Sequence, residues 1–109
     1  MQENERKKLE AAGWKVGNVD EFLGLSSEES AYIEMKLALS QTLRQRRLNN
    51  HLSQMEFAKM VHSSQSRIAK MEAGDPSVSI DLIVKSLLAL GASTQDVANA
   101  ISSATSRAA

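Results

Sequence analysis

The chain has 109 residues, enough for one ordinary domain, and its 42% hydrophobic and 24% charged residues are usual for a globular protein. Aromatic residues make up only 4% and there is no cysteine, which favours packed helices and excludes disulfide scaffolds, cysteine-ligated zinc and thiol catalysis. The formal net charge of 0 hides an asymmetry, since residues 1–35 carry −4, residues 36–70 carry +6 and residues 71–109 carry −2. No apolar run approaches the length of a membrane span and no signal peptide is recognisable, so a cytoplasmic protein without membrane contact is expected.

Residues 1–25 are expected to form a partly irregular N-terminal extension. Three glycines interrupt its second half, between which lie the large apolar residues Trp14, Phe22 and Leu23. These three side chains either cover the end of a helical bundle or present an apolar surface to a partner protein, because aromatic residues often anchor interfaces.

A strong helix start follows the extension. Ser26 is followed three residues later by Glu29, the spacing of a capping box, and a helix is predicted from Ser27 to about Asn49. One apolar stripe runs along it, formed by Tyr32, Met35, Leu39 and Leu43.

Four shorter helices are predicted after this one. Ser53 with Glu56 forms a second capping box and begins a helix to about Val61, and Ser64 caps a third helix to about Ala73, where Gly74 ends it. The last two are expected over Ile80–Leu90, capped by Ser79, and from a cap at Thr94 to about Ala104, with Val97, Ala100, Ile101 and Ala104 on one stripe. The fold class is therefore all-α, with a five-helix domain over residues 26–104 and a disordered tail over 105–109.

Residues 52–74 form a helix-turn-helix pattern of two short helices joined by a tight connection. If Ile68 and Met71 face the core, the second helix turns four side chains outward together: Gln65, Ser66, Ala69 and Lys70. Glutamine can bond an adenine edge with two hydrogen bonds and lysine can serve the acceptors of guanine, so these four are the candidate base-contacting residues.

Other polar residues near this pattern are candidates for phosphate contacts. Gln54 begins the first short helix, where its amide and the backbone N–H groups can hold an anion. Ser64 and Arg67, which lies slightly off the outward face, are further candidates for phosphate contacts. Arg44 and Lys59 either contact phosphates or only aid solubility.

The stretches 52–61 and 64–74 resemble the Cro/CI (XRE-type) DNA-binding domain of phage repressors. The resemblance runs from about Leu39 to Ile101 and rests on six positions that match together: Gln54, Ala58, Ile68, Met71, Glu72 and Gly74. One position departs from the pattern, because the turn residue that is usually glycine is His62.

The resemblance implies a lambda-repressor-like fold and a function. It implies a repressor that binds double-stranded DNA sequence-specifically, as a homodimer on a palindromic operator. It also implies a structural ion pair between Arg47 and Glu72, which match a basic residue and a glutamate that pair in the family.

A narrower resemblance supports an alternative function. Residues 13–17, 22–25 and 87–92 are similar to the HigA-like antitoxins that are paired with RelE-fold toxins. The chain would then mask a small basic toxin with its acidic N-terminal third, and DNA binding would serve autoregulation.

No residue pattern indicates catalysis, a cofactor or a metal site. His51 and His62 are the only imidazoles and lack the spacing of zinc ligands, so neither an enzyme nor a bound cofactor is expected. The methionines at helical spacing are expected to fill the core: Met35, Met55, Met60 and Met71.

Overall fold

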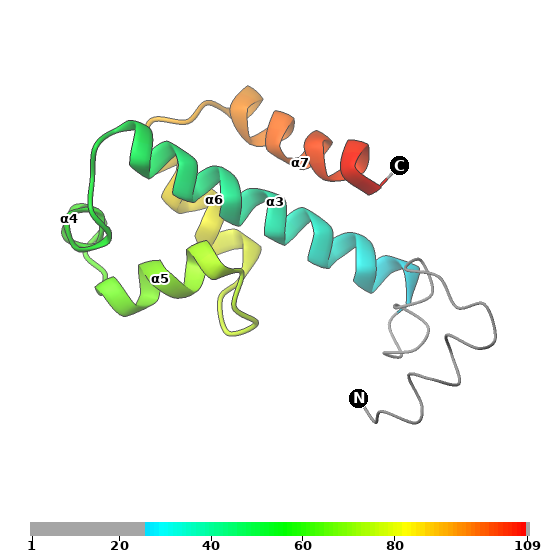
Figure 1. The fold of residues 1–109 in the computed structure, drawn as a ribbon, viewed down its shortest axis with the longest axis horizontal. Helices are drawn as coiled ribbons and strands as arrows, with labels where there is room; N and C mark the ends of the chain where they lie inside the picture. Colours follow the sequence, from blue (N-terminus) through cyan, green and yellow to red (C-terminus); the bar gives the residue numbers. More distant parts are fainter. Residues whose placement is uncertain (1–25, 109) are drawn as a thin grey trace, which may run out of the picture. The chain divides into compact units, whose positions relative to one another are not determined.

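The computed structural model describes residues 26–108, with side chains as far as Ala104. These residues form five α-helices and no strand: α3 (Ser27–Asn49), α4 (Gln54–Met60), α5 (Gln65–Ala73), α6 (Ile80–Ala89) and α7 (Thr94–Ala108) (Figure 1). The predicted all-α, five-helix fold is confirmed. None of these helices is long and apolar enough to cross a membrane. Trp14, Phe22 and Leu23 lie outside the described residues.

Serine side chains begin the short helices as the sequence predicts. Ser53 Oγ accepts from the backbone N–H of Glu56 at 3.0 Å, and the Glu56 carboxylate accepts from the N–H of Ser53 at 2.8 Å. This second bond, made to the charged form, lowers the pKa of Glu56. Ser64 and Ser79 likewise cap α5 and α6.

The start of α7 differs from the prediction by one residue. Ser93, not Thr94, is the cap: its Oγ accepts from the N–H of Asp96 at 3.0 Å, and Asp96 accepts from the N–H of Ser93 at 2.8 Å. Both residues are good capping residues, and the carboxylate three positions after Ser93 decides between them. The helix also continues to Ala108, past the expected end at Ala104.

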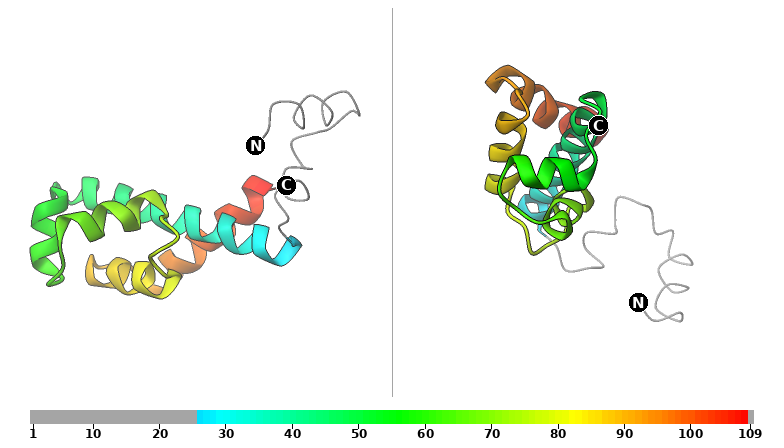
Figure 2. Two further views of the ribbon diagram at one scale, coloured as in Figure 1. Left: turned by 90° about the horizontal axis from the view of Figure 1, so that it is seen from below. Right: turned by 90° about the vertical axis from the view of Figure 1, so that its left-hand side faces the viewer.

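A core formed by all five helices holds the domain together. Helix α4 lies near the C-terminal end of α3 and packs on α5, α5 and α7 lie on opposite sides of α3 in the view of Figure 1, and α6 packs on α7 (Figures 1 and 2). The largest fully buried apolar side chains are Phe57, Leu39, Leu43, Ile68, Met71, Ile83 and Leu87. Val97, Ala100 and Ile101 of α7 pack against this core, so the stripe on α7 is used within the chain.

Two of the four methionines expected in the core lie at the surface. Met71 is buried and Met35 half-buried, but Met55 and Met60 are 58% and 52% exposed. Helix α4 has only seven residues, and Phe57 and Ala58 occupy its buried side, so Met55 and Met60 face away from the core. The prediction for these two residues was wrong.

Left-handed backbone conformations mark both ends of α4. His51 precedes the helix with φ 57°, and His62, in the turn between α4 and α5, has φ 55°. A left-handed conformation raises the free energy of a residue with a Cβ atom but not that of glycine. This difference explains why glycine is the usual residue at a turn of this shape.

Replacing His62 with glycine is therefore expected to stabilise the fold. The free energy of unfolding is expected to rise by about 0.5–1 kcal/mol. This value is the energetic cost of the left-handed conformation for His62, reduced by the larger conformational entropy that a glycine loses on folding. His62→Val is expected to lower it, since a β-branched side chain tolerates positive φ least. Chemical denaturation of the three proteins measures both changes, and equal stabilities would contradict the strained turn.

Candidate nucleic-acid interface

The second helix of the helix-turn-helix, α5, presents a polar edge to solvent. Its apolar side is fixed, because Ile68 and Met71 are fully buried in the core. On the other side Gln65, Ser66 and Lys70 are exposed, and Ala69 is half-buried. These four side chains are called the polar edge of α5 below. They are the residues that the sequence proposes as base contacts, and none of them is consumed by the core.

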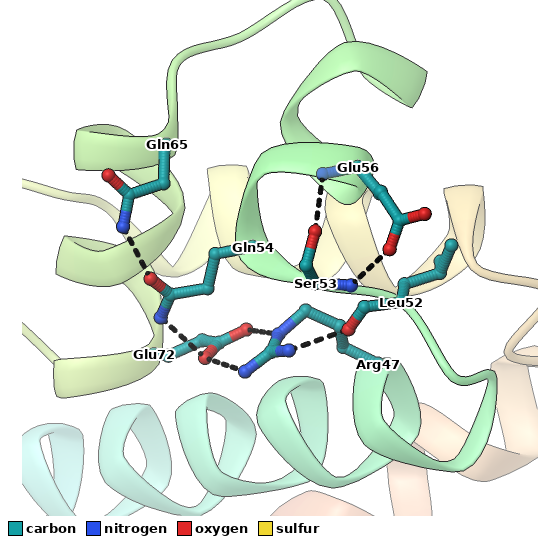
Figure 3. Close-up of polar contacts among 7 residues, drawn as sticks. All are labelled: Arg47, Leu52, Ser53, Gln54, Glu56, Gln65 and Glu72. Atoms are coloured by element: carbon teal, nitrogen blue, oxygen red, sulfur yellow. Dashed lines mark hydrogen bonds and ion pairs between the residues drawn. The ribbon is translucent and has the colours of Figure 1, made fainter.

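An ion pair between Arg47 and Glu72 joins α3 to α5 (Figure 3). Arg47 Nε donates to Glu72 Oε2 at 2.6 Å and Arg47 Nη2 donates to Glu72 Oε1 at 3.0 Å. A third bond runs from Arg47 Nη1 to the backbone oxygen of Leu52 at 2.7 Å. The side chains are only 8% and 3% exposed, and the hydrogen bond to Glu72 raises the pKa of Arg47.

Two glutamines connect the buried pair to the surface. Gln54 Nε2 donates to Glu72 Oε1 at 3.1 Å, and Gln54 Oε1 accepts from Gln65 Nε2 at 2.8 Å (Figure 3). Both ends of the Gln54 amide are thus occupied within the protein, and the amide of Gln65 is held from one side. Sequence reasoning treated Gln54 as a phosphate contact only and did not foresee this bridge, which links the first residues of α4 and α5.

A groove beside α5 brings together several of the other candidate residues. It has a volume of about 580 Å³ and lies between α5, the following loop and the start of α6. Ser64, Ser66, Arg67 and Lys70 all line it, together with Lys85 of α6, a residue that the sequence did not single out. Lys85 was missed because it is the only basic residue between Lys70 and Arg107, in an acidic part of the chain.

The remaining basic candidates lie elsewhere on the surface. Arg44 on α3 and Lys59 on α4 are exposed, and neither lines this groove. Arg46 is engaged differently, since its Nη2 donates to the Asp96 carboxylate at 3.0 Å and ties α3 to the start of α7. Within residues 26–108 no three histidine or acidic side chains gather to hold a metal ion.

Arg47→Met is expected to lower the free energy of unfolding by about 3 kcal/mol, because it leaves the buried Glu72 carboxylate without its partner. Arg46→Met is the matched control on the same helix. Its ion pair with Asp96 is 31% and 42% exposed, and its loss is expected to cost less than about 1 kcal/mol. Thermal and urea unfolding of the two variants measures the contrast; equal losses would contradict it.

The comparison with protein families agrees with the geometry. A family model described as helix-turn-helix matches residues 43–97, half of the chain, from the end of α3 to the start of α7. No curated protein and no solved structure matches the chain. The match covers the ion pair, both short helices and the polar edge of α5, and the chain belongs to the Cro/CI-type (XRE) helix-turn-helix family of DNA-binding transcriptional regulators.

Proposed function

We propose that this regulator is a repressor that binds a palindromic operator as a homodimer, with the polar edge of α5 in the major groove. The observation that carries the proposal is the position of Gln65, exposed at the start of α5 and held by Gln54 against a buried ion pair. An amide that is already oriented loses less conformational entropy on bonding a base than a freely rotating amide does.

Each side chain of the edge suits a particular base contact. Gln65 can bond the N6 and N7 atoms of adenine, Lys70 can donate to the O6 and N7 atoms of guanine, and Ser66 can bond several bases. Ala69 can touch only the methyl group of thymine. The edge therefore has the chemistry for reading several neighbouring base pairs.

Phosphate contacts supply affinity and orientation in this proposal. Arg67 and Ser64 flank the edge in the groove beside α5, where a DNA strand on the edge would pass. Arg44 and Lys59, which are exposed on α3 and α4, add further contacts, whereas the Gln54 amide is engaged with Glu72 and Gln65. In a symmetric dimer the two α5 helices face successive major grooves about 34 Å apart.

DNA binding is expected to be salt-dependent and selective. If a dimer neutralises about eight phosphates, the slope of log K against log[salt] is about −7. Selection of bound duplexes from a random pool, followed by titrations at several salt concentrations, measures both properties. A flat salt response with no enriched sequence would overturn the proposal.

Variants of two lysines are expected to distinguish a base contact from a phosphate contact. Lys70→Ala is expected to relax preference at about one base pair by roughly 1–3 kcal/mol, because the edge loses one base contact. Lys59→Ala is expected to weaken all duplexes alike and to reduce the salt slope of the dimer by about 2, because each subunit loses one phosphate contact. The selected duplex and its single-base variants, titrated with each protein, distinguish the two outcomes; the same uniform loss for both lysines counts against base contact by Lys70.

Neutralisation of a toxin is the second candidate function. The net charge of −4 in residues 1–35 favours it, since an acidic segment is complementary to a small basic protein. Co-purification of the full chain with a basic protein encoded beside it, lost on deletion of residues 1–25 while operator binding remains, is the expected result. Residues 1–25 carry only −1 of this charge, so the deletion is combined with Glu28→Gln, Glu29→Gln and Glu34→Gln in a second variant. Retention of the partner by that variant would contradict this role.

A further inference from the structure

A second groove lies on the side of the helix-turn-helix where α4 ends. It has a volume of about 320 Å³ and is bounded by the end of α4, the turn to α5, and the middle of α6. It adjoins the groove beside α5, since Arg67, Leu82 and Lys85 line both. The other lining residues are Met60, Val61, His62, Ser63, Met71, Ser86 and Ala89.

About half of the lining of this groove is apolar, although the groove is open to solvent. Met60 is 52% exposed, whereas the neighbouring Phe57 of the same helix is fully buried. Val61 and Leu82 are half-buried, so the domain leaves apolar surface uncovered here. A methionine suits such a place, because its flexible thioether can adapt to the side chain of a partner.

The rim of the groove carries only positive or neutral polar groups. Arg67 and Lys85 stand on α5 and α6, and His62 is held at the turn. No carboxylate lines the groove itself, but Asp81, which lines the neighbouring groove, pairs with Lys85 at 3.2 Å. Both side chains of this pair are largely exposed, so the pair is weak and a carboxylate of an occupant can replace Asp81. An occupant with acidic side chains flanking an apolar one would complement both the apolar lining and the rim.

We propose that this groove docks an acidic amphipathic segment of a partner protein. An apolar side chain of the segment sits against Met60 and Leu82, and its carboxylates pair with Arg67 and Lys85. A buried apolar anchor with a charged rim is the usual anatomy of a protein interface.

The partner would act as a regulator of DNA binding, a step that rests on the proposed function. Arg67 lines both grooves, so a carboxylate paired with it removes a cation that the operator phosphates need. Segment and operator therefore compete for the same arginine, and occupation of the groove releases the repressor from DNA.

A phage-displayed library of random short peptides, panned on the full chain without DNA, tests the docking site. We expect enrichment of peptides with acidic residues around a large apolar residue. Met60→Ser is expected to weaken binding of the consensus peptide about tenfold, the effect of losing one apolar contact. The matched control is Met55→Ser, which changes the other exposed methionine of α4, outside the groove, and is expected to leave binding unchanged.

Several results would overturn the proposal: enrichment of basic or uncharged peptides, no enrichment at all, or equal binding by the parent and Met60→Ser. Disruption of a dimer by Met60→Ser would show that a second copy fills the groove instead. The selected duplex, added to the labelled peptide complex, is expected to displace the peptide; simultaneous binding would remove the regulatory role. Because peptide binding is measured without DNA and duplex selection without peptide, failure of either proposal is seen separately.

Discussion

The arrangement of the candidate nucleic-acid interface depends on one buried ion pair, between Arg47 and Glu72. Arg47 extends from α3 into the space beneath the helix-turn-helix and there meets Glu72, near the end of α5, and the carbonyl of Leu52, just before α4. Three segments are joined by one guanidinium group whose donors lie in a fixed plane. Replacing such a pair with apolar residues can leave a protein as stable as before, so we infer that this pair serves mainly to fix the orientation of the three segments. What it orients is visible at its outer end, where Glu72 holds Gln54 and Gln54 holds Gln65.

The close crossing of α4 and α5 imposes a second constraint. Ala58 is 3% exposed in the middle of α4, and a larger residue there would hold α5 away from it. The connection is only four residues long, and His62 accepts a left-handed conformation so that the chain can turn in that space. A strained turn and a small residue together set the distance across which Gln54 and Gln65 bond.

Local signals in the sequence predict most of the fold. Serine caps place the starts of α3, α4, α5 and α6, the first two with a glutamate three positions later, and apolar spacing separates buried Ile68 from exposed Gln65. Both signals depend on neighbours along the chain. Properties that depend on distant residues were missed. The bridge from Gln54 to Gln65 joins two helices, and the exposure of Met60 depends on which side of α4 packs on the core. Hydrophobic character alone could not show that Met71 is buried and Met60 is not.

The proposed docking groove lies next to the edge of α5 that we propose as the DNA contact, and this position has a physical consequence. A ligand that binds far from the operator must change the conformation of the protein to affect repression, and this small domain has a core that joins all the helices. A ligand that shares Arg67 with the operator needs no such change, because two anions compete for one cation. At low ionic strength each phosphate contact contributes most to DNA affinity, so the DNA affinity that is lost when a carboxylate occupies Arg67 is largest there. In a domain where a buried ion pair holds Gln65 through Gln54, the proposed control by direct competition requires no rearrangement of the core.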